Sequence, residues 1–344
     1  MKREIIIYIF LLASIFPLNL MSQDQANTKD SFRNYYTGMI GEKYKIGMDL
    51  TIEKPKLNGL YSYNSQGKTI SVVGEIDSKG NFSLRDDETN ETGSLKGSFA
   101  NSFNEIKGEW TSQDGKKKLP LSLQKAAEYK TVKDNGYNVS VTYPVFLSIS
   151  PIKDLNQYIA RKMNGYIDSG KAALKESIDE ADAQDSALIS QYSFETSAAI
   201  DYISESLSSL ICTEYVYSGG AHPTFSYFAL NYSLKSGAIK EIKTADLFKP
   251  KTNFAQLLSD ECIKELKENQ VPSIMSGEIT DISEQIQKGW IPFTVLQAGL
   301  KFYFSPYTIG SYADGPFECV VKYSKIKNSL NLEGVLSEFA KNIK

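Results

Sequence analysis

The sequence has few of the residues that build metal centres and nucleic-acid interfaces. One histidine and three cysteines occur among 344 residues, which excludes most zinc sites with several His and Cys ligands. Lys and Arg number 38 against 41 Asp and Glu, a net charge of -3, so nucleic-acid binding has no electrostatic basis at the level of the whole chain. We therefore expect no metal, no cofactor and no nucleic-acid partner.

Long apolar runs are also scarce, and the one near the N-terminus predicts export. A basic start precedes the apolar segment from Ile5 to Phe16, which is short for a transmembrane helix and typical of a secretory signal peptide. We predict a signal peptide over residues 1–22 and a flexible linker over 23–34. An uncleaved anchor is the alternative, because Leu20 stands where a small residue is preferred before cleavage. The mature protein would be periplasmic or extracellular, with no membrane span.

The three cysteines, Cys212, Cys262 and Cys319, allow at most one disulfide within the chain. Cys212 and Cys319 lie in apolar runs that predict buried strands, whereas Cys262 lies in a helical pattern. Buried, inert thiols are the simplest interpretation. A bridge between Cys212 and Cys319 on neighbouring strands is the alternative for an exported protein.

What the sequence does have is enough apolar residues, 41% of the chain, for about two packed domains. Residues 35–125 consist of short alternating runs separated by turn signals such as Asn58-Gly59 and Asp114-Gly115. This pattern is typical of antiparallel hairpins. We predict an all-β meander or small barrel.

After residue 125 the pattern becomes mixed, which predicts an α+β fold with an antiparallel sheet backed by helices. Leu155, Ile159 and Met163 recur at helical spacing and form an apolar stripe behind Asp154. Further helices are predicted over 254–267 and 332–343. Strands are predicted over 192–203, 207–217, 225–234, 293–296, 300–304 and 317–323.

Three ordered motifs in this half carry a family resemblance: YVYSGGAHP over 215–223, NYSLKSG over 231–237 and FYFSPYTIGSYADG over 302–315. They resemble the exported domain of unknown function found in the anti-sigma factor RsiV and in the peptidoglycan deacetylase PdaC. The segment before them is similar to the companion domain of PdaC. The resemblance implies a PdaC-like segment over 128–210 and an RsiV-like domain over 211–344.

The resemblance also implies a setting in the cell envelope. In RsiV the module captures lysozyme, and in PdaC the chemistry belongs to a separate metal-dependent domain. We expect neither a sigma-factor-binding segment nor a deacetylase domain in this chain. The resemblance therefore implies that this chain binds a lysozyme-like protein or peptidoglycan.

The candidate site residues come from these motifs. His222 follows Gly219 and Gly220 and precedes Pro223, in a loop where glycine permits positive φ and proline fixes the exit. It is either a pH-sensitive contact or a hydrogen-bonded organiser of the loop. If the motifs are adjacent strands, tyrosine rings would gather near His222. These rings are candidates for a binding site because tyrosine suits both sugar stacking and protein interfaces. The rings are those of Tyr215, Tyr217, Tyr303, Tyr307 and Tyr312. The alternative is ordinary strand alternation, in which one tyrosine face packs in a core and the other covers the sheet.

Two functions of different class follow. The first is a non-catalytic, exported binding protein whose site includes these tyrosines, the glycine loop and Asp314. The second is an envelope hydrolase or esterase that uses His222 with Asp314 or Glu214. No Ser or Cys nucleophile is identifiable beside the histidine, which favours the first.

Overall fold

The computed structural model describes residues 31–86, 93–147, 152–180, 189–235 and 238–343. The predicted signal peptide lies outside these residues, as does most of the predicted linker. The linker prediction was wrong for residues 31–34, because the first strand, β1 (Ser31–Ile40), begins there. The Phe32 ring packs against the core of the N-terminal sheet and anchors the start of this strand.

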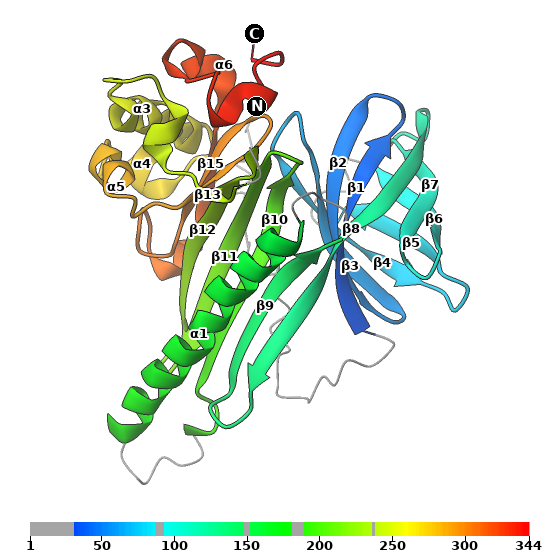
Figure 1. Ribbon diagram of the computed structural model, residues 1–344, viewed down its shortest axis with the longest axis horizontal. Coiled ribbons are helices and arrows are strands. Elements are labelled where there is room, and N and C mark those ends of the chain that lie inside the picture. Colours follow the sequence, from blue (N-terminus) through cyan, green and yellow to red (C-terminus); the bar gives the residue numbers. More distant parts are fainter. Residues whose placement is uncertain (1–30, 87–92, 148–151, 181–188, 236–237, 344) are drawn as a thin grey trace, which may run out of the picture.

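The N-terminal strands form a closed, antiparallel, up-and-down barrel (Figure 1). Each strand pairs with the next, and β1 also pairs with β8, which closes the sheet. Gly97 and Gly108 face each other across two strands, and a Cβ on Gly108 would lie 2.7 Å from the Gly97 Cα, so only glycine permits this approach. The other strands are β2 (Tyr44–Glu53), β3 (Lys56–Tyr63), β4 (Thr69–Ile76), β5 (Asn81–Asp86), β6 (Ser94–Ala100), β7 (Glu105–Thr111) and β8 (Lys118–Asp134).

Strand β8 belongs to both halves of the molecule. Its first part pairs with β1 and β7 in the barrel, and its second part leaves the barrel to pair with β9 (Val139–Phe146). The barrel and the second sheet are therefore one continuous hydrogen-bonded ladder, and their connection is a strand rather than a flexible linker (Figure 1).

A long helix, α1 (Ile152–Glu180), covers one face of the second sheet (Figure 1). Leu155, Ile159 and Met163 are fully buried against that face, as their spacing predicts. The sheet continues through β10 (Ser193–Ile203), β11 (Leu207–Tyr217), β12 (Thr224–Ser233) and β13 (Lys240–Glu241). The α+β prediction is confirmed, except that β9 and β10 are parallel, because α1 returns the chain to the end where β9 began.

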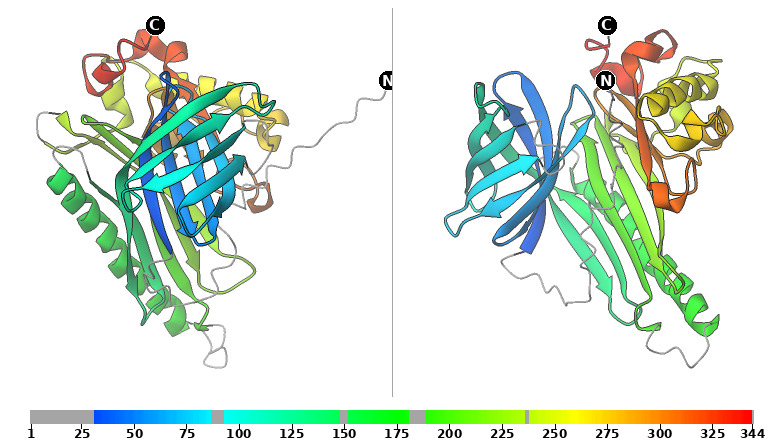
Figure 2. Two further views of the ribbon diagram at one scale, coloured as in Figure 1. Left: turned by 90° about the vertical axis from the view of Figure 1, so that its right-hand side faces the viewer. Right: turned by 180° about the vertical axis from the view of Figure 1, so that it is seen from behind.

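A smaller sheet packs on the opposite face of β10–β12. It contains β14 (Phe293–Val295), β15 (Gly299–Phe304) and β16 (Phe317–Lys322), and helices cover its outer side (Figure 2). The helices are α3 (Phe254–Glu268), α4 (Pro272–Met275), α5 (Ser283–Gln287) and α6 (Tyr323–Ile326), with short 3-10 turns at Thr244–Leu247, Tyr312–Asp314, Lys327–Ser329 and Val335–Glu338. The predicted final helix is wrong, since only the turn at Val335–Glu338 forms there. No helix in the described ranges is long and apolar enough to cross a membrane.

The disulfide joins Cys262 to Cys319 and leaves Cys212 as a buried free thiol. Both sequence interpretations of the cysteines, three free thiols or a Cys212–Cys319 bridge, were wrong. Cys212 faces α1, whereas Cys319 belongs to the core on the other side of the sheet, so the two cannot meet. Helix α3 packs on β16 and brings Cys262 to Cys319; the Glu265 carboxylate also accepts a hydrogen bond from the Val320 amide at 3.0 Å.

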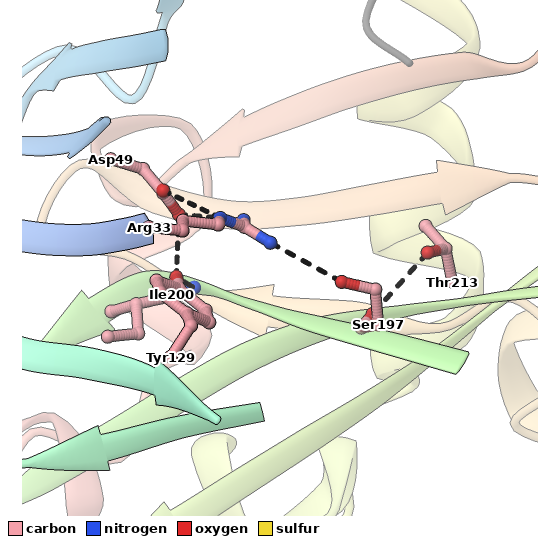
Figure 3. A network of polar contacts seen from close by, with 6 residues as sticks. All are labelled: Arg33, Asp49, Tyr129, Ser197, Ile200 and Thr213. Carbon is pink, nitrogen blue, oxygen red and sulfur yellow. Dashed lines mark hydrogen bonds and ion pairs between the residues drawn. The ribbon is translucent and has the colours of Figure 1, made fainter. Parts of the chain in front are cut away.

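A polar network joins the barrel to the second sheet (Figure 3). Arg33 on β1 donates two 2.8 Å hydrogen bonds to Asp49 on β2, and its guanidinium lies 4.0 Å above the ring of Tyr129 on β8. The Tyr129 hydroxyl donates to Asp49 at 2.6 Å, and Arg33 reaches the hydroxyl of Ser197 on β10 at 3.4 Å. These residues are buried or half-buried, and a bidentate pair that is largely shielded from water orients its elements strongly.

Candidate functional site

The β11–β12 turn and the loop after β15 meet at the surface, and His222 lies at their contact. Its ring stacks on that of Tyr312, with centroids 4.0 Å apart and planes inclined by 20°. His222 Nδ1 lies 2.9 Å from the Pro223 carbonyl and Nε2 lies 3.4 Å from the Tyr307 hydroxyl. Because a carbonyl only accepts, Nδ1 donates, and Nε2 of the neutral ring accepts from Tyr307.

Backbone geometry holds these rings in place. Gly219 and Gly220 have φ of 99° and 90°, which only glycine adopts without strain, and the Tyr217 hydroxyl donates to the Gly220 carbonyl at 3.3 Å. Tyr307 has a φ of 68°, a strained value for a bulky residue, and its side chain is 66% exposed. Ser305 accepts a 3.0 Å hydrogen bond from the Tyr227 amide and so ties this loop to β12.

Tyr303 does not join this surface. Along β15, Leu300, Phe302 and Phe304 face the helices, so Tyr303 faces the larger sheet, where it is buried and donates to the Asp201 carboxylate. Burial raises the pKa of Asp201, and nearby Lys301 partly opposes this. The surface position of this tyrosine was conditional on β11 and β15 being adjacent strands. They belong to different sheets, and only the loop after β15 reaches His222.

The carboxylates that the hydrolase hypothesis needs lie elsewhere. Asp314 accepts hydrogen bonds from the Ser311 amide at 2.8 Å and hydroxyl at 2.7 Å, so it ends a turn, and these bonds lower its pKa. Glu214 lies on the α1 side of β11, where its charge acts on Tyr166. Within the described ranges, the hydrogen bonds of His222 go to Pro223 and Tyr307 alone. The arrangement fixes an imidazole but gives it no acid partner.

Burial raises the pKa of Glu214, so ionisation of this carboxyl lowers the stability of the folded protein, and the loss depends on pH. The folded protein holds the proton more tightly than the unfolded chain, so stability falls as pH rises above the ordinary value of 4.5. We expect Glu214→Gln to raise stability at pH 7 by about 1 kcal/mol or less, since the residue is only half-buried. The gain should vanish below the ordinary pKa in thermal unfolding scans. A gain that persists at low pH, or that the exposed control Glu278→Gln reproduces, would contradict this cause.

Two site residues were missed at the sequence level. Trp290 is 67% exposed, with the Lys288 ammonium 4.4 Å from its ring. The backbone amide of Tyr303 donates to the Pro292 carbonyl at 3.0 Å, so the start of β14 lies beside the end of β15. Trp290, just before β14, is therefore at the same end of the hairpin as Ser305 and Tyr307. The sequence did offer a signal for Trp290. It is one of two tryptophans in the chain and lies between Gly289 and Ile291-Pro292, a sequence typical of a turn.

The second missed residue is Glu195, which lies directly across from Tyr215 on the neighbouring strand. Burial raises the pKa of Glu195, and Lys133 partly opposes the rise. Burial likewise raises the pKa of Tyr215, and the negative charge of the nearby Glu195 adds to the rise. We call His222, Tyr215, Trp290, Tyr307 and Tyr312 the aromatic surface; Tyr217 supports its loop.

No group of three or more His, Cys, Asp or Glu side chains in the described part of the chain is close enough to hold a metal ion. The comparison with curated proteins gives no match. The solved structures similar to this chain include two that are described as DUF3298 family proteins. The one from Pseudomonas aeruginosa PAO1 is 15% identical with a TM-score of 0.39, covering 60% of this chain and 92% of that one. The one from Bacteroides fragilis NCTC 9343 is 17% identical with a TM-score of 0.38, covering 63% and 98%.

Two family models match consecutive parts of the chain. Residues 130–224 match the model described as Deacetylase PdaC, and residues 245–324 match that of a protein family of unknown function, DUF3298. His222 lies in the first match, and Tyr307 and Tyr312 lie in the second, so the aromatic surface forms where the two segments meet. The resemblance found in the sequence is confirmed: a match to the PdaC model is followed along the chain by a match to the DUF3298 model.

Proposed function

We propose that this chain is an exported, non-catalytic binding protein of the cell envelope that captures a lysozyme-like protein on its aromatic surface. The observation that carries the proposal is the fixed contact of His222, Tyr307 and Tyr312 across the two matched segments. Large aromatic rings held rigidly at a surface lose little entropy on binding, which is why they dominate protein interfaces. The signal peptide pattern supports export, and the PdaC and DUF3298 matches fit a cell-envelope setting.

One charge beside the aromatic surface, that of Glu195, fits a basic partner, whereas Lys288 at the Trp290 ring and Lys133 near Glu195 are positive. Glu195 is half-buried next to Tyr215, and the whole chain has a net charge of -3. A partly buried carboxylate beside tyrosine faces attracts an ammonium or guanidinium group, because the rings and the carboxylate both favour positive charge. A basic protein would therefore bind here faster at low salt than at high salt.

The enzyme hypothesis finds less support. Acid–base catalysis by histidine needs an orienting carboxylate and a nucleophile within hydrogen-bond reach. Here Nδ1 is held by a backbone carbonyl and Nε2 by a tyrosine hydroxyl, while Asp314 and Glu214 serve other elements. The histidine organises a binding loop in this proposal.

Removing the most exposed ring is the direct test of the surface. We expect Tyr307→Ala to weaken binding of a c-type lysozyme about 10-fold, or about 1.4 kcal/mol, as a central interface tyrosine does. His222→Ala should have a similar effect, because it releases Tyr312 from its stack. Calorimetric titration measures both. The control is Leu147→Ala, which truncates an exposed apolar side chain next to β9, away from this surface. Unchanged affinity in both site variants would contradict the assignment of the aromatic surface as the lysozyme-binding site.

Cell-wall glycan is a second candidate ligand. Trp290 and Tyr307 are each about two-thirds exposed at one end of the β14–β15 hairpin, and exposed aromatic faces stack on sugar rings as well as on proteins. Titration of the same variants with soluble peptidoglycan fragments distinguishes the two ligands. Saturable binding of fragments that Tyr307→Ala abolishes, without lysozyme binding, would favour the glycan.

A further inference from the structure

Positive charge gathers at one end of the second sheet, away from the aromatic surface. Residues 240–251 and 322–333 carry seven lysines and three acidic residues, a net charge of +4, although the whole chain has a net charge of -3. The two segments lie side by side, because the Lys249 amide donates to the Ser329 carbonyl at 2.9 Å. The fold thus brings together two lysine-rich segments that are far apart in the sequence.

Five lysines of these segments form what we call the lysine end. All five are exposed, and none of them forms an ion pair within the described ranges. The Lys249 ammonium donates to the Asn328 carbonyl at 2.7 Å, which brings it to the segment that carries the last two members. The five are Lys243, Lys249, Lys251, Lys325 and Lys327.

Two acidic residues at the border of the lysine end are offset by other lysines. Burial raises the pKa of Glu265, and nearby Lys322 is among the groups that oppose the rise. Burial likewise raises the pKa of Glu338, and Lys235 and Lys45 are among the groups that oppose it. These carboxylates therefore have lysine neighbours that are not members of the lysine end.

The acidic residues inside the two segments do not cancel the charge either. Glu241 follows Lys240 directly in the chain, so that pair is neutral. The Asp246 carboxylate accepts a 3.0 Å hydrogen bond from the Lys243 amide and closes its own turn. Glu333 is exposed. With Asp246 and Glu333 counted against the five lysines, the lysine end keeps a net charge of +3.

The backbone presents one of these lysines in a strained conformation. Pro250 and Lys251 are the central residues of a turn that the Thr252 amide closes on the Lys249 carbonyl at 3.2 Å. Lys251 has a φ of 66°, where glycine or asparagine is usual and a longer side chain is strained. Strain of this kind is found most often where a side chain serves binding.

The lysine end and the aromatic surface lie at opposite ends of both sheets (Figure 1). Strand β12 begins two residues after His222 and pairs with β13 at its other end, about 30 Å away for ten residues of strand. Strand β16 likewise begins beside Phe304 and ends at Lys322, where α6 follows. A surface that holds the lysine end would therefore leave the aromatic surface turned away from it.

We propose that the lysine end docks this protein on a membrane surface that contains anionic phospholipids. Clusters of basic side chains are attracted to acidic headgroups within a distance that salt sets. All five cations are lysines, point charges that suit many loosely placed phosphates better than one phosphate bound in a bidentate fork. The exposed large apolar side chains of the described ranges lie outside the two segments, so base stacking, on which single-stranded nucleic acid binding depends, has no basis here. The proposal does not depend on lysozyme capture.

Vesicles of phosphatidylglycerol and phosphatidylcholine in equal parts are the probe, and vesicles of phosphatidylcholine alone are the uncharged control. Cosedimentation of the protein from Gln23 onward, which contains every described residue, measures binding without the apolar N-terminal run. We expect binding to the anionic vesicles to be at least about 10-fold tighter at low salt, and most of this difference to vanish in about 0.5 M salt. The double variant Lys249→Glu, Lys327→Glu should weaken binding at least about 10-fold.

The matched control is Lys162→Glu, Lys175→Glu, which reverses two exposed charges on α1 and gives the same total charge. It should bind anionic vesicles as wild type does. Acrylamide should quench the exposed Trp290 as well on vesicles as in solution, and protection of this ring would contradict the orientation. Docking is overturned if neutral vesicles bind equally, if the lysine-end variant binds like wild type, or if the control loses as much. Tighter binding of a DNA duplex, or competition by dilute glycerol phosphate, would also overturn it.

Discussion

Replacing Arg33 by alanine is expected to destabilise the protein by about 3–5 kcal/mol, because it leaves the partner carboxylate of a mostly buried ion pair without its charge partner. The side chains of Arg33 and Asp49 are 24% and 11% exposed and form a bidentate pair. Without the guanidinium, the carboxylate of Asp49 would stay inside the junction with only the Tyr129 hydroxyl to satisfy it. An uncompensated buried charge is what makes such a truncation costly.

Urea unfolding of Arg33→Ala against wild type measures this cost. The control is Lys116→Ala, which breaks an exposed ion pair with Asp114 and should change stability by less than about 1 kcal/mol. The double variant Arg33→Met with Asp49→Leu should recover much of the loss, because it removes both charges together. A loss below about 1 kcal/mol for Arg33→Ala would show that the network does not hold the barrel against the second sheet.

Removing the Cys262–Cys319 bridge is expected to cost up to about 4 kcal/mol. The two cysteines are 57 residues apart, and closing a loop of that length lowers the entropy of the unfolded chain by about that amount. The double variant Cys262→Ala, Cys319→Ala should therefore unfold at lower urea concentration, and reductant should shift wild type in the same direction. Reductant should have no effect on the stability of the double variant.

Thiol counting gives an independent check on the pairing. The oxidised, denatured protein should show one reactive thiol, that of Cys212, and the reduced protein should show three. Three thiols before reduction, or a bridge that includes Cys212, would contradict the structure.

The strand pattern of the fold was predictable because side chains alternate locally. The predicted strand over 207–217 coincides with β11, and the glycine turns of residues 35–125 predicted a meander that the structure closes into a barrel. Alternation does not say which strands pair across long separations. The parallel pairing of β9 with β10 and the position of Cys319 against α3 depend on tertiary packing, which a single sequence does not show.

The site was predictable in part for the same reason. The motif of residues 215–223 pointed to the His222 loop, and Tyr307 and Tyr312 reach it as expected from the paired motifs. Tyr303 is in the same motif, but strand alternation turns it inward to Asp201. Trp290 belongs to none of the three motifs, and its place at the same end of the hairpin as Tyr307 follows only from the pairing of β14 with β15.

Calorimetric titration of the protein from Gln23 onward with a c-type lysozyme, together with the rate at which that lysozyme degrades cell walls, tests the proposed function most directly. The proposal predicts saturable binding that weakens with salt, inhibition of the lysozyme, and about 10-fold weaker binding and inhibition in Tyr307→Ala. Absence of binding at high micromolar concentration would contradict lysozyme capture by the aromatic surface.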